Sequence, residues 1–78
     1  MIEKQHRLYA VLRNPKHEHL ILHIAEVGQF ETSGQAQTAR LAGHDKWKDY
    51  GVEFFVRSGP IYPVADKTYD QLLERAKQ

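Results

Sequence analysis

Arginine and aromatic residues alternate at two places in the chain, and these side chains are the clearest candidates for contacting a partner. Arg7 and Tyr9 are two residues apart, as are Phe55 and Arg57. Arg13 is an even number of residues from Arg7 and Tyr9 and so shares their side of a strand. Residues two apart on a strand point to the same side of a sheet. Aromatic rings on an exposed sheet can stack on unpaired bases while arginines hold phosphates. The same residue types are also enriched at the centre of protein–protein interfaces, where lysine is sparse.

The histidines are the residues that could bind a metal ion. His17, His19 and His23 share parity and would face one side of a continuous strand. At a rise of about 3.3 Å per residue, His19 and His23 lie roughly 13 Å apart, too far to share one ion. His17 and His19 are close enough to chelate, but a further ligand would have to come from elsewhere, such as His6. Because zinc sites need three or four convergent ligands, we predict no metal site.

Groups suited to catalysis are scattered. Ser33 lies at an expected helix start and Ser58 in a Ser-Gly-Pro turn, and neither position fits a nucleophile elbow. Asp45 and Asp49 are one helical turn apart, but they alternate with lysines on what we expect to be a solvated face. The glycines never cluster into a phosphate-binding loop, and the chain contains no cysteine. We therefore predict a non-enzymatic protein without a cofactor.

Three strands are expected to position the candidate residues. The first, from Arg7 to Arg13, is apolar on both faces, because Leu8 and Leu12 point one way while Tyr9 and Val11 point the other. The second strand follows the Asn14-Pro15 turn and is expected to place Leu20, Leu22 and Ile24 on one face and His19, Ile21 and His23 on the other. The third is Val52 to Arg57, with Val52, Phe54 and Val56 turned towards the core.

Two helices are predicted from capping signals and apolar spacing. Thr32 and Gln35 fit a capping box before a helix from Ser33 to Tyr50, which Gly51 ends. Its apolar stripe is Ala36, Ala39, Gly43, Trp47 and Tyr50. The stripe is coherent only if the helix continues through Gly43, and its small residues would lie close to the sheet while Trp47 and Tyr50 fill the wider end. A second helix begins near Asp66 or Thr68 and carries Tyr69, Leu72, Leu73 and Ala76.

The element order β-β-α-β-α restricts the topology. A right-handed crossover through the first helix makes the third strand parallel to the second, and the doubly apolar first strand belongs in the centre. The sequence therefore predicts one α+β domain over residues 1–78. It has a three-stranded sheet in the order 2-1-3, with both helices packed on the face of Leu8, Leu20 and Phe54.

The opposite sheet face is expected to be open and to carry the function. The residues predicted to bind a protein partner there are Tyr9, Val11, Ile21, His23, Phe55 and Arg57. The alternative partner is single-stranded nucleic acid, contacted by Arg7, Arg13, Arg57, Tyr9 and Phe55. A third possibility is that a loop or the N-terminal segment covers this face.

Composition favours a self-associating protein. A chain of 78 residues without disulfides is small for an unaided hydrophobic core, and association is a common remedy. We therefore expect a homo-oligomer, most simply a two-fold dimer, that pairs through the open face. Eleven lysines and arginines balance ten acidic residues, so no polybasic segment is present. No apolar run is long enough for a signal-peptide core or a membrane span, which predicts a cytoplasmic protein without membrane contact.

Overall fold

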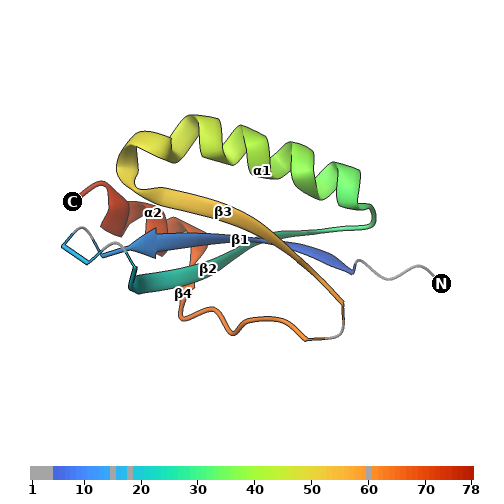
Figure 1. Cartoon of the computed structure of the whole chain (residues 1–78), viewed down its shortest axis with the longest axis horizontal. Coiled ribbons are helices and arrows are strands. Elements are labelled where there is room, and N and C mark those ends of the chain that lie inside the picture. The colour runs from blue at the N-terminus through green and yellow to red at the C-terminus, as the bar shows by residue number, and fades with distance from the viewer. Residues whose placement is uncertain (1–4, 15, 18, 60) are drawn as a thin grey trace.

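The chain folds into a four-stranded sheet and two helices, shown in Figure 1. A computed structural model describes residues 5–14, 16–17, 19–59 and 61–78. The elements in chain order are β1 (His6–Arg13), β2 (Ile21–Phe30), α1 (Ser33–Trp47), the 3-10 turn η1 (Lys48–Tyr50), β3 (Val52–Ser58), β4 (Lys67–Thr68) and α2 (Tyr69–Ala76). The mixed α+β class predicted from the sequence is confirmed.

The sheet has the strand order β3-β1-β2-β4. Strand β1 is antiparallel to both β2 and β3, and β4 is parallel to β2. The first three strands thus follow the predicted order, but the expected total of three is wrong. The fourth strand contains only Lys67 and Thr68, which pair with Ala25 and Glu26. Two residues show no hydrophobic alternation, so this strand leaves no periodic signal in the sequence.

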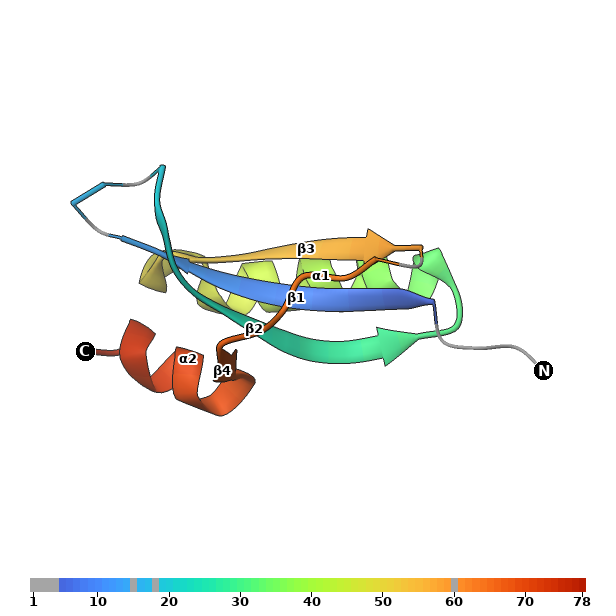
Figure 2. The ribbon, with the colours of Figure 1, turned by 90° about the horizontal axis from the view of Figure 1, so that it is seen from below.

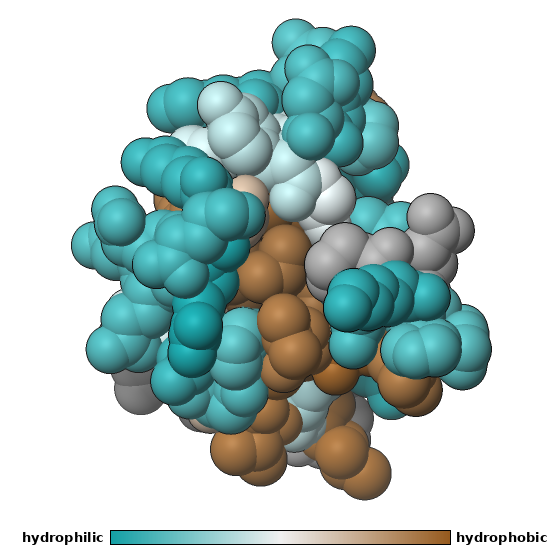
Figure 3. Space-filling model, turned by 90° about the vertical axis from the view of Figure 1, so that its left-hand side faces the viewer, coloured by the Kyte–Doolittle hydropathy of each residue, from teal (hydrophilic) through white to brown (hydrophobic). Residues whose placement is uncertain are grey.

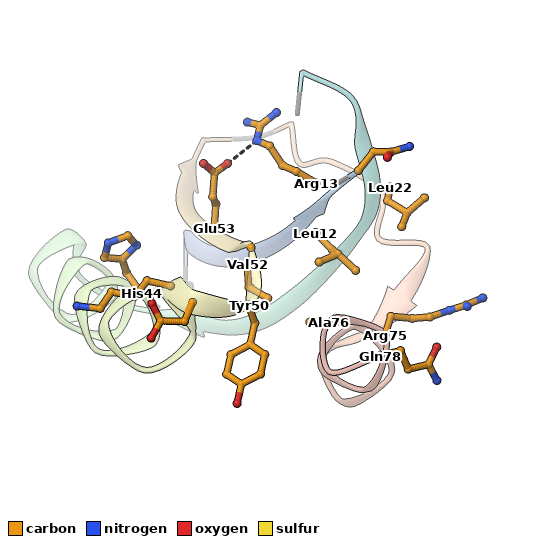
Figure 4. A pocket seen from close by; sticks show the side chains of 14 residues that line it. Leu12, Arg13, Leu22, His44, Tyr50, Val52, Glu53, Arg75, Ala76 and Gln78 are labelled. Carbon is orange, nitrogen blue, oxygen red and sulfur yellow. Dashed lines mark hydrogen bonds and ion pairs between the residues drawn. The ribbon is translucent and has the colours of Figure 1, made fainter. Parts of the chain in front are cut away.

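Burial of β1 agrees with its apolar sequence. All five residues from Leu8 to Leu12 are buried, which requires cover on both faces of the sheet because successive side chains point to opposite sides. On one face, Leu8 and Leu12 join Phe54 of β3 and Leu72 of α2 in the hydrophobic core. Both helices lie on this face, as Figure 4 shows when the sheet is viewed from its end. That part of the prediction is confirmed.

Helix α1 lies close to β3 because its inward residues are small. The Thr32 hydroxyl accepts a hydrogen bond from the Gln35 amide at 3.2 Å and caps the helix. The helix continues through Gly43, where an added Cβ would lie 2.9 Å from the Phe54 ring. The final turn tightens into the 3-10 turn η1, and Gly51 ends it with a φ of 74°. A left-handed φ favours glycine because it has no Cβ.

Helix α2 begins at a complete capping box. The Thr68 hydroxyl accepts from the Gln71 amide at 3.2 Å, and the Gln71 side chain accepts from the Thr68 amide at 3.1 Å. Leu72 on the inner side of the helix is fully buried. In the described ranges of the chain, no helix is long and apolar enough to cross a membrane.

Two β-bulges in β2 overturn the predicted facing of its residues. The pairing with β1 shifts between Leu8 and Tyr9 and again between Leu12 and Arg13. As a result Ala25 lies opposite Ala10 in the core, and Ile24 lies opposite Val11 on the other face. Each extra residue reverses the alternation that follows it, so parity counted along the sequence fails here.

The start of β2 also differs from the prediction. The strand begins at Ile21, so Leu20 is an exposed turn residue rather than a core residue. His19 likewise lies in the turn and not on the strand face. This turn is held by Asn14, whose amide donates to the Leu20 carbonyl and whose side chain accepts from the Lys16 amide. Asparagine favours such a turn because its side chain bonds to the backbone two residues on.

Candidate functional site

The sheet face opposite the helices is covered over its centre, as Figure 2 shows where the chain between β3 and β4 crosses β1. We call residues 61–66 the covering segment. Its Tyr62 hydroxyl donates to the Gln5 carbonyl at 2.6 Å, and the Arg7 guanidinium lies 3.9 Å from the centre of the Tyr62 ring. Tyr9 and Val11 are only 1% and 3% exposed. The expectation that this face is open is therefore wrong at Tyr9 and Val11, and the alternative of a covering loop describes it better.

The covering segment is fastened at its other end by Asp66. Its carboxylate accepts a hydrogen bond from the Ile24 amide at 2.8 Å and lies 3.0 Å from His23 Nδ1, while its own amide donates to the Ile24 carbonyl. The hydrogen bond from the Ile24 amide, together with His23, holds the pKa of Asp66 below its ordinary value of 3.8. His23 was predicted to bind a partner, but the structure assigns it to this internal contact.

The two aromatic residues predicted for the face lie together. The rings of Tyr9 and Phe55 stack with their centres 5.3 Å apart and an interplanar angle of 18°. Tyr9 is buried under the covering segment, whereas Phe55 is half-buried on β3. In this arrangement a base could stack on Tyr9 only after the segment moved away. The nucleic-acid hypothesis therefore gains no support from the geometry.

Two of the three arginines on this face lie beside acidic residues. Arg7 Nε lies 3.5 Å from a Glu26 oxygen, and Arg13 Nε lies 2.5 Å from a Glu53 oxygen. Arg57 is exposed on β3 directly opposite Arg7. Of the six residues predicted to bind a partner, Ile21 and Arg57 are exposed, His23 and Phe55 are half-buried, and Tyr9 and Val11 are buried.

The histidines described here contact single neighbouring side chains and do not gather into a metal-binding cluster. The rings of His17 and His19 meet edge to face with centres 6.1 Å apart. In the part of the chain that the structure describes, no group of three or more His, Asp or Glu residues could hold a metal ion. His6 Nδ1 lies 2.5 Å from Ser58 Oγ, a pair that sequence spacing could not show because 52 residues separate the two. A serine nucleophile also needs a group that orients the histidine and a site for the substrate. Neither His6 nor Ser58 lines the groove that is described next.

A groove of about 830 Å³ opens between the ends of the two helices, at the end of the sheet (Figure 4). Its floor includes Leu12 and Val52, and Tyr50 of η1 and Ala76 of α2 line its two sides. Tyr50 is 47% exposed, so the expectation that it fills the space between helix and sheet is wrong. The charged and polar residues around the opening are Arg13, Asn14, His44, Lys48, Asp49, Glu53, Arg75 and Gln78.

Leu22 extends the apolar lining of the groove into the β1–β2 hairpin. It is the extra residue of the second bulge, because Leu12 pairs with His23 and Arg13 pairs with Ile21. Bulges commonly redirect a side chain, and here Leu22 lines the groove beside Leu12. Leu20, Ile21 and Leu22 are 49%, 54% and 46% exposed. Figure 3 shows the resulting band of apolar surface between hydrophilic flanks at this end of the molecule.

Sequence reasoning missed this groove because it assigned the groove's residues to the core. Leu22 and Tyr50 both fit an apolar stripe, and neither stripe shows where the helices that cover the sheet end. One signal was present: Leu20, Ile21 and Leu22 form an unbroken apolar run, whereas a strand exposed on one side alternates. No protein-family model, curated protein or solved structure matches the chain.

Proposed function

We propose that the protein is a small non-enzymatic interaction protein that binds an apolar segment of a partner protein in the groove between α1 and α2. The observation that carries the proposal is the position of Leu22, which is half exposed and lies beside Leu12 and Val52 at the groove. A single exposed leucine is ordinary on a protein surface. Contiguous apolar side chains in a concave site are typical of binding sites, and this continuity supports the proposal.

The proposal keeps protein binding, as the sequence suggested, and moves the binding surface. Tyr9 and Val11 are buried by the covering segment, so they cannot contact a partner in this arrangement. Ile21 is exposed next to Leu22 in the chain but does not line the groove. The groove volume of about 830 Å³ falls within the usual range for ligand pockets, roughly 300–1,000 Å³, and accommodates several side chains.

The residues around the groove indicate the chemistry of the partner segment. Arg75 is exposed at the rim, while Arg13 is matched by Glu53 and Lys48 Nζ lies 3.8 Å from an Asp45 oxygen. Helices on two sides and an apolar floor resemble grooves that accept an amphipathic helix by its apolar face. We therefore propose a partner segment with apolar residues at helical spacing and acidic residues near its ends.

A displayed-peptide selection tests the proposal. The wild-type protein would be the target, with no counter-selection, and the affinity of the selected peptides for a Leu22→Asp variant would then be measured. We expect selected peptides to carry apolar residues three or four apart, and to bind Leu22→Asp about tenfold more weakly, because a charge replaces an apolar contact. Amide chemical-shift changes on binding should cluster at Leu12, Tyr50, Val52 and Ala76.

Leu41→Asp is the matched control, because Leu41 is exposed on α1 and does not line the groove. It should bind the selected peptides as well as the wild-type protein does. Equal affinity for the wild-type protein and Leu22→Asp, or shift changes confined to another face, would refute the proposal.

A further inference from the structure

The outer edge of β3 has no strand partner in the described part of the chain. There β3 pairs with β1 alone and lies at one edge of the sheet, as Figure 2 shows. The strand has seven residues, Val52–Ser58, whereas β4 at the opposite edge has two. A long edge strand presents backbone donors and acceptors that can pair with another chain, and proteins usually interrupt such edges with proline, bulges or charged side chains. Strand β3 contains no proline, its pairing with β1 is regular throughout, and its two charged residues, Glu53 and Arg57, have opposite signs.

The residues of β3 are arranged so that the strand complements itself. When two copies of a strand pair antiparallel about a two-fold axis, each residue lies opposite the one equally far beyond the central position. With Phe55 at the centre, Glu53 of one copy lies opposite Arg57 of the other, and the same pair recurs by symmetry. Phe54 lies opposite Val56 on the helix-covered face, so the five central residues pair apolar with apolar or acid with base, and only the end residues Val52 and Ser58 are unlike.

We propose that the protein forms a two-fold homodimer in which the β3 edges of two copies pair antiparallel, centred on Phe55, to give one continuous sheet. The β3 edge shares Val52 and Glu53 with the groove, but the pairing of two β3 edges does not depend on the proposed function. Opposite charges directly across neighbouring strands stabilise a sheet, as do facing aromatic residues.

The side chains of β3 are placed for this pairing. Phe55 stacks on Tyr9 within its own chain, so a second Phe55 beside it would lengthen the aromatic row across the two-fold axis. The Glu53 side chain is 55% exposed while it contacts Arg13, which leaves it room for a second arginine. Arg57 is exposed on the same side of β3 as Glu53, because the two are four residues apart on a regular strand.

Cysteine cross-linking tests the pairing register, and the chain has no cysteine of its own. Directly opposite residues on antiparallel strands have Cα atoms about 4.5–5.5 Å apart, within the range that a disulfide spans. We expect Phe55→Cys chains to cross-link with themselves on oxidation. We expect Glu53→Cys chains to cross-link only when mixed with Arg57→Cys chains, because two copies of either position lie roughly 13 Å apart along the strands. Glu74→Cys, on the exposed surface of α2, is the control and should not cross-link.

Charge reversal supplies an independent readout. Glu53→Arg and Arg57→Glu should each weaken dimerisation about tenfold in Kd, since two facing pairs become like-charged, and the double variant should restore most of the affinity. Sedimentation equilibrium measures the Kd, and urea unfolding of each variant separates this effect from loss of the Arg13 contact. A monomeric mass at high micromolar concentration, cross-linking without preference for the stated pairs, or a double variant as weak as the single variants would overturn the proposal.

Discussion

Replacing Gly43 by alanine is expected to destabilise the protein, although alanine is the better helix former. In an exposed helix the substitution would gain about 1 kcal/mol from backbone propensity. Here the new Cβ would lie 2.9 Å from both Cε2 and Cζ of Phe54. Carbon atoms in good contact are about 3.5–4.0 Å apart, so the helix or the ring must move by more than half an ångström. Phe54 is 8% exposed and its ring also meets Tyr69 edge to face, which restricts its movement.

The size of the effect follows from two opposing contributions. Overpacking a closed core costs about 1–3 kcal/mol, against which the propensity gain of about 1 kcal/mol is set. We therefore expect Gly43→Ala to lower the free energy of unfolding by about 1 kcal/mol. For a domain of this size such a loss lowers the melting temperature by roughly 4–8 °C. Urea unfolding followed by far-ultraviolet circular dichroism, at one fixed protein concentration, would measure it.

Two comparisons isolate the cause. Gly34→Ala lies in the first turn of α1, where an added Cβ meets no atom within 4 Å apart from its chain neighbours and the helix's own backbone, so it should be neutral or stabilising. In a Phe54→Leu background the smaller side chain removes the obstruction, and Gly43→Ala should then become less harmful. If Gly43→Ala stabilises the protein as much as Gly34→Ala does, the close approach of α1 to β3 is refuted.

Three further substitutions test the contacts that hold the covering segment and α2. Tyr62→Phe removes the hydrogen bond to Gln5 and should lower the free energy of unfolding by about 1 kcal/mol, and an unchanged urea midpoint would contradict this. Folding lowers the pKa of Asp66, so its carboxylate contributes stability above the ordinary value of 3.8, and that stability is lost as pH falls through this value towards the folded pKa. Asp66→Asn should therefore lower the urea midpoint at neutral pH, and a difference that persisted in strong acid would argue against the charge as the cause. Thr68→Ala removes the capping box of α2 and should cost about 0.5–2 kcal/mol by thermal unfolding, whereas Thr68→Ser should not.

Features that depend on neighbouring residues could be predicted from the sequence. The capping threonines Thr32 and Thr68 mark the starts of both helices because a hydroxyl three residues before an amide satisfies it locally. Gly51 marks the end of η1 because glycine, which has no Cβ, adopts the left-handed backbone there without strain. The apolar residues on both faces of β1 identified the central strand, since only a strand covered on both sides buries five residues in a row.

Features that depend on distant residues were decided by the tertiary structure. The covering segment is held by Tyr62 bonding to Gln5, 57 residues away, and by Asp66 bonding to Ile24, 42 residues away. No local pattern encodes such contacts, so the sequence could indicate a doubly apolar strand without showing what covers its second face.

The same reason applies to the candidate site. The sequence by itself determined which residues are apolar, including Leu22 and Tyr50. Leu22 lines the open groove because a bulge redirects its side chain. Tyr50 lines the groove because α1 and α2 end beside it over the sheet. A bulge adds one residue against a partner strand, and that partner is chosen only when the chain folds.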